Sequence, residues 1–220
     1  LGTTFTAAAV LRNDTARIAS LGSRGAAIPS VVLLREDETV LTGEAAERRA
    51  MTESDRVARE FKRRIGDQTP ILLAGSPDSA EALMSRLLRS VVEEVTTREG
   101  EAPTTVAVTH PANWGPYKID LLQQAIRLAD VGAPVQLLTE PEAAAITYAS
   151  EQRLEVGEVV AVFDLGGGTF DAAVLQRTDG GFRVLGEPEG IERLGGIDFD
   201  AAVFAHVARA LGEGLTGLDE

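Results

Sequence analysis

The sequence has no cysteine, few lysines and no long apolar segment, and each of these absences excludes a class of protein. A chain without cysteine forms neither disulfides nor thiolate metal sites, which fits a cytoplasmic protein. No apolar run approaches the roughly 18 residues that a membrane-spanning helix needs. The net charge of −13 repels nucleic-acid backbones and anionic lipid surfaces, so we expect neither a nucleic acid nor a membrane as a partner.

The two lysines of the chain, Lys62 and Lys118, exclude one common type of nucleotide site. Neither lysine follows a glycine, so the chain has no phosphate-binding loop of the Gly-Lys-Ser/Thr type. The two histidines, His110 and His206, have no partner at metal-ligand spacing, and we interpret both as structural. A nucleotide site in this chain must therefore be built in another way.

The most informative stretch of the sequence is the segment 158–175, in which three glycines separate two apolar runs. Residues 159–163 have the β-branched, apolar composition of a buried strand, and residues 170–174 alternate as a second strand does. A hairpin of this kind exposes bare backbone N–H groups at its glycine tip, where they can bind phosphate oxygens. Asp164 and Asp171, at the two ends of the tip, would face the same ligand.

Two alternatives to a phosphate-binding hairpin exist. A dinucleotide fingerprint needs a third glycine and a following helix, but Asp171 occupies the glycine position and a strand pattern follows. A glycine-rich hairpin without a ligand explains the three glycines equally well. An internal repeat favours the phosphate site, because aligning Thr4 with Thr169 also aligns the alanines that follow. Unless these alanine-rich strands are alike by chance, two turns 165 positions apart (169 − 4) predict a duplicated fold whose two lobes face one ligand.

The order of the expected elements predicts an α/β domain with a central sheet. Glu140 and Asp164 both fall just past the carboxyl ends of expected strands, where open α/β sheets place ligands. Lys62 falls in a strongly charged segment whose pattern is more typical of a solvated helix face. We expect strands at 3–11, 17–20, 30–34, 40–41, 105–109, 135–139, 159–163, 170–174 and 182–185, and helices at 45–51, 55–65, from Ser76-Pro77-Asp78 to Gly100, 116–131, 141–152 and from Gly195-Gly196 onward; the tail 212–220 has turn composition.

The segment 164–171, Asp-Leu-Gly-Gly-Gly-Thr-Phe-Asp, resembles the second phosphate loop of DnaK-type heat-shock chaperones, which belong to the actin-like ATPase superfamily. Leu-Gly-Thr-Thr at 1–4 is similar to the first phosphate loop of the same family. Further matches occur in family order over nearly the whole chain, at Ile28 to Val32, Lys62 to Gly66, Pro111-Ala112, Glu140-Pro141 with Ala143 to Ala145, and Gly195 to Asp200.

This resemblance implies an α/β, actin-like ATPase (ribonuclease H-like) fold, with a complete first lobe and a truncated second lobe. Residues 1–28 and 100–157 would form the core of the first lobe, and residues 29–99 an inserted outer subdomain. Residues 158–220 would begin the second lobe. We therefore expect a fragment of a longer protein, whose adenosine-binding segments and substrate-binding domain lie elsewhere.

The resemblance further implies an ATPase that binds ATP/ADP with Mg²⁺ and meets client polypeptides and co-chaperones through other regions. Lys62 would orient the attacking water and neutralise γ-phosphate charge, Glu140 would place or deprotonate that water, and Asp164 and Asp171 would organise the metal shell, with Asp164 holding the metal through water. A divalent cation is also required physically, since each carboxylate–phosphate pair at about 4 Å costs roughly 4 kcal/mol at an effective dielectric near 20. The implied nucleotide-binding residues are Gly2, Thr3, Thr4, Phe5, Gly166, Gly167, Gly168, Thr169, Gly195 and Gly196.

The sequence departs from the family pattern at two places. The family's first loop begins with an aspartate that helps to hold the metal, and Leu1 follows that position. Pro111 matches a proline that couples nucleotide state to the partner domain, but Ile119, beside Lys118, stands where the coupling arginine is expected. Two other functions stay open: a sugar or small-molecule kinase of the same superfamily, and a non-hydrolysing, nucleotide-sensing relative.

Overall fold

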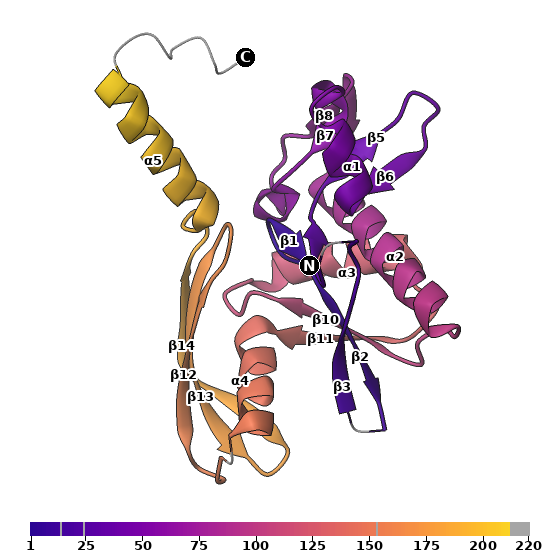
Figure 1. The fold of residues 1–220 in the computed structure, drawn as a ribbon. Helices are drawn as coiled ribbons and strands as arrows, with labels where there is room; N and C mark the ends of the chain where they lie inside the picture. The colour runs from indigo at the N-terminus through magenta and orange to yellow at the C-terminus, as the bar shows by residue number, and fades with distance from the viewer. Residues whose placement is uncertain (14, 24, 153, 212–220) are drawn as a thin grey trace.

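The computed structural model describes residues 1–13, 15–23, 25–152 and 154–211, which form a mixed α/β structure of small sheets and helices (Figure 1). The predicted mixture of strands and helices is thus confirmed. The described residues contain no helix with the length and apolar character needed to span a membrane. The strands are β1 (Phe5–Thr6), β2 (Ala8–Arg12), β3 (Thr15–Ala19), β4 (Ile28–Pro29), β5 (Val32–Leu34), β6 (Val40–Thr42), β7 (Val57–Ala58), β8 (Ile71–Leu73), β9 (Ser76–Asp78), β10 (Val106–His110), β11 (Val135–Thr139), β12 (Val159–Leu165), β13 (Phe170–Thr178) and β14 (Gly181–Ile191). The helices are α1 (Gly43–Arg49), α2 (Ala80–Glu99), α3 (Pro116–Ala129), α4 (Glu140–Glu151) and α5 (Gly196–Leu211), with 3-10 turns η1 (Ser54–Arg56) and η2 (Phe61–Arg64).

The main hydrophobic core surrounds α2, whose apolar residues recur every three or four positions. Leu83 and Leu87 are almost completely buried, and α3 adds Leu122 and Ala125 to the same cluster. Spacing of this kind places apolar side chains on one face of a helix, so the predicted long helix is confirmed. Its start was predicted wrongly: Ser76–Asp78 is the short strand β9, and Ser79 caps the helix by accepting a hydrogen bond from the Ala82 amide.

The parallel pair β10 and β11 positions the start of α4. The two strands run side by side in register from Val106 opposite Val135 to His110 opposite Thr139, with α3 as the crossover between them. The carboxyl ends of both strands therefore lie at the same edge. Thr139 caps α4 there, and Glu140 is the first residue of the helix, one residue before the predicted start at Pro141.

The three-stranded antiparallel sheet β12–β13–β14 carries the glycine-rich turn at one end. The predicted hairpin is present, with Leu165 opposite Phe170 and Asp164 opposite Asp171. One face of the sheet packs on α4, where Ala145, Ala173 and Leu175 are buried together. From the end of β14 the chain enters α5, which projects away from the sheet (Figure 1) and buries none of its described residues.

Two further fold predictions were wrong. Instead of a helix over 55–65, the structure has η1, β7 and η2, because Glu60 adopts a left-handed backbone conformation (φ 54°) that a regular helix cannot include. Instead of one central sheet, the described residues form six small sheets, since most strands pair only with a hairpin neighbour or another short segment. The predicted turn at 212–220 lies outside the described residues.

Candidate functional site

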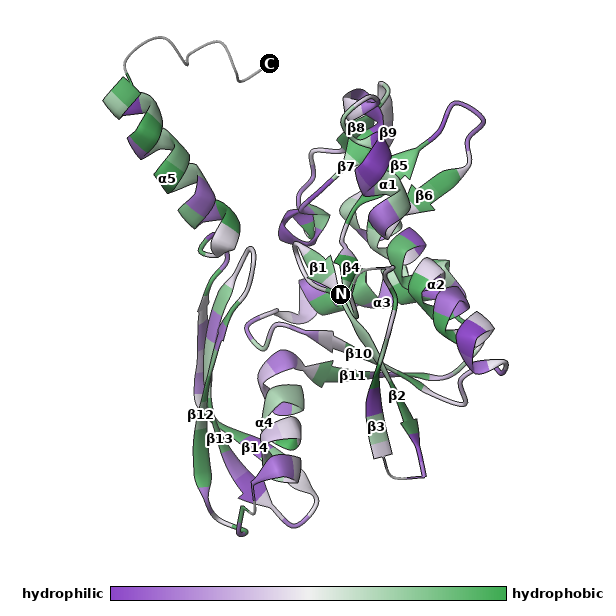
Figure 2. Ribbon diagram, in the orientation of Figure 1, coloured by the Kyte–Doolittle hydropathy of each residue, from purple (hydrophilic) through white to green (hydrophobic). Residues whose placement is uncertain are grey.

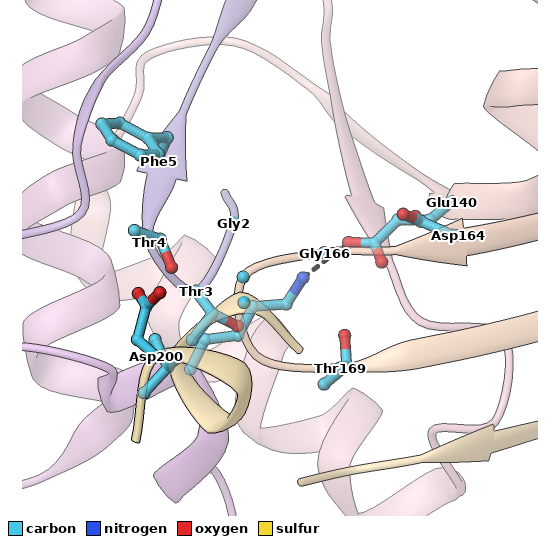
Figure 3. Close-up of a pocket in the computed structure, with 13 residues that line it drawn as sticks. Gly2, Thr3, Thr4, Phe5, Glu140, Asp164, Gly166, Thr169 and Asp200 are labelled. Carbon is cyan, nitrogen blue, oxygen red and sulfur yellow. Dashed lines mark hydrogen bonds and ion pairs between the residues drawn. The ribbon is translucent and has the colours of Figure 1, made fainter. Parts of the chain in front are cut away.

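Five separate segments of the chain meet around one cavity of about 430 Å³. These segments are the first residues of the chain, η2, the start of α4, the turn between β12 and β13, and the start of α5. Figure 3 shows Thr3, Thr4 and Asp200 on one side of this space, with Glu140, Asp164 and Thr169 on the other. The lining residues are Gly2, Thr3, Thr4, Phe5, Lys62, Glu140, Asp164, Gly166, Gly167, Thr169, Gly196, Ile197 and Asp200.

The two turns that the internal repeat singled out are in direct contact. A Cβ atom on Gly167 would overlap the Thr4 hydroxyl, and one on Gly168 would overlap the Thr3 side chain. Both positions must therefore be glycine for the turns to approach this closely. Thr4 and Thr169, which the sequence placed at equivalent positions, line the same cavity from opposite segments.

The carbonyl groups of the glycine turn are all engaged by other parts of the protein. The Gly166 carbonyl accepts from the Gly196 amide (3.1 Å), and the Gly167 carbonyl accepts from the Ile197 amide (2.9 Å). The Gly168 carbonyl accepts from two nitrogens of the Arg63 guanidinium, at 2.8 and 2.6 Å. Every carbonyl of the turn is thus held on the side of α5 and Arg63.

The amides of the same peptides face the other way. In a trans peptide the N–H points opposite to the C=O, so the Gly167 and Thr169 amides point away from the groups that hold the Gly166 and Gly168 carbonyls. Among the described residues neither amide has an acceptor, although both residues line the cavity. Unpaired backbone donors beside a cavity can bind an anion.

Lys62 is buried at the cavity wall and forms an ion pair with Glu140. Its Nζ atom donates to Glu140 Oε1 at 2.6 Å, and the two side chains are only 7% and 16% exposed. The ammonium group also lies 5.9 Å from the centre of the Trp114 ring. The residue pattern alone favoured a solvated Lys62, but the short η2 turn that follows left-handed Glu60 directs this side chain inward.

The carboxylates around the cavity disfavour one another's ionised form. Burial, followed by the charge of Glu140, raises the pKa of both Asp164 and Asp171, while Lys62 acts in the opposite direction. Asp164 lines the cavity, whereas Asp171 is 5% exposed and lies behind the wall. Asp171 Oδ2 has no hydrogen-bond partner among the described residues. A Cβ on Gly190 would collide with both Asp171 and Asn113, so these side chains lie close together.

The residues that line the cavity and the residues selected from the sequence overlap only in part. Ile197 and Asp200 line the cavity but were not selected, although both lie in the Gly195 to Asp200 motif. Gly168 and Gly195 do not line it; they pack behind the turn, where a Cβ on Gly195 would overlap the Gly167–Gly168 peptide. The position of Asp200 in the sequence could have indicated it, because this residue lies one helical turn after Gly196 at the start of the same helix.

The donor set of the cavity fits a magnesium polyphosphate better than a bare metal ion. The described residues contain no group of three or more His, Asp or Glu side chains arranged to hold a metal. Mg²⁺ commonly binds one or two carboxylates and takes its other ligands from substrate phosphates and water. Asp164 can supply such a carboxylate, and the amides of Gly167 and Thr169 can bind phosphate oxygens. The cavity volume lies in the range of small-molecule sites, about 300–1,000 Å³.

The chain matches one family of known proteins over nearly its full length. The family, described as Hsp70 protein, matches residues 1–74 and 72–219. These two ranges include the first turn, Lys62, Glu140 and the glycine turn, so every wall of the cavity lies within the match.

Proposed function

The chain belongs to the Hsp70 family of chaperone ATPases, and from this premise we propose that its cavity binds MgATP and supports ATP hydrolysis. The mixed α/β structure fits the actin-like ATPase domain of that family. The observation that carries the proposal is the contact between the two glycine-containing turns at one cavity, which Lys62 and Glu140 also line; the second turn contributes two unpaired amides, those of Gly167 and Thr169. Client polypeptides and co-chaperones would be engaged in the cytoplasm, through regions other than this cavity.

The proposed division of the chain follows the family pattern. Residues 1–28 and 100–157 would form the core of a first lobe, with residues 29–99 inserted as an outer subdomain. The segment 158–220 would begin a second lobe. The separate β12–β13–β14 sheet supports a boundary near residue 158, since β12 begins at Val159; α4 would then pack across the boundary, on one face of this sheet.

The phosphates of the nucleotide would lie between the two turns. Thr3 and Thr4 would contact them from one side, and the amides of Gly167 and Thr169 from the other. Mg²⁺, when bound, would neutralise phosphate charge and polarise the γ-phosphorus. Asp164 would hold a water ligand of that ion. Asp171, which packs behind the wall, would act on the water shell through the neighbouring Asp164.

Hydrolysis would proceed by attack of water on the γ-phosphorus, in line with the bond to the oxygen that leaves with ADP. Lys62 would orient this water and balance the charge that develops on the γ-phosphate oxygens. Glu140, held in place by Lys62 and by the first turn of α4, would accept a hydrogen bond from the water and take up its proton. The burial of both side chains supports fixed positioning, which together with charge stabilisation supplies most of the catalysis in phosphoryl transfer.

The proposal is tested by titrating ATP into the protein with Mg²⁺ and again with EDTA. The carboxylates of the wall repel free triphosphate, so we expect EDTA to weaken binding by about tenfold or more. Gly167→Ala should abolish the Mg²⁺-dependent binding because its Cβ would overlap Thr4, whereas Gly180→Ala, where the Cβ meets open space, should leave it unchanged. Equal affinity with and without Mg²⁺, or equal loss in both variants, would contradict the proposal.

A non-hydrolysing, nucleotide-sensing relative is the second candidate, and one observation favours it. At the position of the family's coupling arginine the chain has Ile119, and the adjacent Lys118 forms an ion pair with Glu192, at the end of β14. This pair ties the start of α3 to the residue that follows β14. Single-turnover measurement with bound ATP separates the candidates, since the sensing relative would retain ATP without releasing phosphate.

A further inference from the structure

Arg63, the residue after Lys62, joins three segments that are distant in the sequence. Its guanidinium donates twice to the Gly168 carbonyl of the glycine turn and also pairs with Asp198 at the start of α5. The side chain is 11% exposed, and a third contact reaches Glu60 at 3.5 Å. Asp198 Oδ2 also accepts a hydrogen bond from the Gly195 amide (2.8 Å). The hydrogen bond from Arg63 lowers the pKa of the Asp198 carboxyl, so Asp198 stays charged.

Among the three carbonyls of the glycine turn, only that of Gly168 is held by a side chain. The Gly166 and Gly167 carbonyls are held by backbone amides of α5, which a substitution does not remove. The Gly168 carbonyl belongs to the same peptide as the Thr169 amide. This amide points away from Arg63, has no acceptor among the described residues, and belongs to a residue that lines the cavity. The orientation of the Thr169 amide therefore depends on Arg63.

A guanidinium suits this position for a geometric reason. Its planar, rigid fork can donate from two nitrogens to one carbonyl while the same group pairs with a carboxylate. A lysine ammonium carries the charge but lacks the fork, so it would reach Gly168 or Asp198 with a single directed contact. Arg63 also lies beside Lys62 in η2, so the group that holds the turn and the group that reaches the substrate come from one short, rigid segment.

We propose that Arg63 is a positioning residue, which orients the Gly168–Thr169 peptide toward bound phosphate and fixes η2 against the glycine turn and α5. Arg63 does not line the cavity, so it acts through the Thr169 amide and not on the nucleotide itself. The inference deepens the proposed function and rests on it, because it assigns the orientation of one phosphate-binding group to one side chain.

The test compares Arg63→Ala and Arg63→Lys with Arg64→Ala as the matched control. Arg64 is the next residue, but its guanidinium pairs with Asp67 and the Thr69 carbonyl, away from the cavity. The probes are MgATP and magnesium tripolyphosphate, titrated calorimetrically into the full chain. We expect Arg63→Ala to raise both dissociation constants by about 10- to 100-fold with unchanged stoichiometry, the scale of lost charge-assisted hydrogen bonds. The dissociation constants of Arg63→Lys should lie between those of Arg63→Ala and the parent, and those of Arg64→Ala should match the parent.

A second readout needs no ligand. The ¹⁵N–¹H chemical shift of Thr169 in the free protein should move in both Arg63 variants and stay fixed in Arg64→Ala. A loss of structure alone would lower the binding stoichiometry and not the affinity of the folded fraction. If Arg63→Ala does not fold, Arg63→Lys decides the question by the same two measurements.

The possible failures are distinguishable. A parent protein that binds neither probe would overturn the proposed function together with this inference. A parent that binds both, with Arg63 variants within twofold of it or with an unmoved Thr169 shift, would overturn the role of Arg63 alone.

Discussion

At the scale of single residues, the chemistry of the cavity depends on the buried pair of Lys62 and Glu140. Lys62→Ala removes the only lysine at the wall and leaves Glu140 without its partner beside Asp164. We expect the single-turnover rate of ATP hydrolysis to fall on the order of 10²–10⁴, the usual scale for one catalytic group. The matched control is Lys118→Ala, whose ammonium pairs with Glu192 outside the cavity. A decrease of less than about threefold for Lys62→Ala would remove this residue from the mechanism.

The buried carboxylates predict how stability changes with pH. The pKa of Asp171 is raised in the fold by burial and by Glu140, so its stabilising contribution is fully present below the unfolded pKa and is lost as the pH rises through the folded pKa. The substituted side chain of Asp171→Asn stays neutral, so the melting temperature of this variant should increase relative to that of the parent as the pH rises above about 4. Thermal melts between about pH 4 and 7 measure this difference.

Asp37→Asn is the control with the opposite sign. Hydrogen bonds from Thr39 lower the pKa of Asp37, so its contribution is present above the unfolded pKa and is lost as the pH falls. This variant should lose melting temperature relative to the parent as the pH rises. A difference between Asp171→Asn and the parent that does not change with pH would show that Asp171 ionises as freely in the fold as in the unfolded chain.

At the scale of elements, α2 shows how a cap defines where a helix begins. Ser79 accepts a hydrogen bond from the Ala82 amide, one of the four amides at a helix start that have no partner within the helix. Ser79→Ala should lower the free energy of unfolding by about 0.5–2 kcal/mol. The exposed Ser76, at which the sequence predicted the helix to start, lies in β9, and Ser76→Ala should change stability little. Urea denaturation of both variants measures this, and equal losses would mean that the cap does not stabilise α2.

Elements whose own residues determine them could be predicted from the sequence. The apolar spacing of Leu83, Leu87 and Val91 identified α2, and the three glycines between apolar runs identified the β12–β13 hairpin. The segment 55–65 could not be predicted, because its charged composition suits a helix, whereas the structure breaks it at the extended strand β7 and at the left-handed backbone of Glu60. That conformation is favourable here because it buries Phe61 and directs Lys62 to Glu140. The contact between Lys62 and Glu140 spans 78 positions, so local propensity does not encode it.

The same reasoning applies to the candidate site. Residues within one motif, such as Gly167 and Thr169, were found because the motif is continuous in the sequence. Arg63 was not singled out within its own match to the family, since its function depends on Gly168 and Asp198, which lie 105 and 135 positions away. A side chain that acts by holding another segment leaves no local signal in the sequence.

At the scale of the whole molecule, apolar surface is distributed unevenly between the two ends of the described chain. The face of the β12–β13–β14 sheet away from α4 exposes Val159, Phe163 and Leu165, of which Phe163 is 72% exposed. Apolar residues also recur along α5, the helix that projects beyond the sheet (Figure 2). In the first half of the chain, by contrast, the main core packs around α2, and the exposed large apolar residues lie in several separate segments: Phe5, Leu11, Ile18, Met51 and Leu72. Contiguous exposed apolar surface of this kind is uncommon on isolated folded proteins.

This distribution predicts that the 220-residue chain binds the hydrophobic dye ANS while its first half stays well packed. Phe163 stacks on Phe170 at a ring distance of 6.4 Å, so the sheet offers a flat aromatic surface, and Phe204 adds a ring on α5. The variant Phe163→Ser/Phe204→Ser should lower ANS fluorescence severalfold without changing the far-ultraviolet circular dichroism. Leu72→Ser is the control, because Leu72 is also exposed but lies in the short β8–β9 hairpin. If Leu72→Ser lowered the dye signal as much as the double variant, the dye would be reporting general loosening of the core, and the apolar surface of the sheet and α5 would not be its binding site.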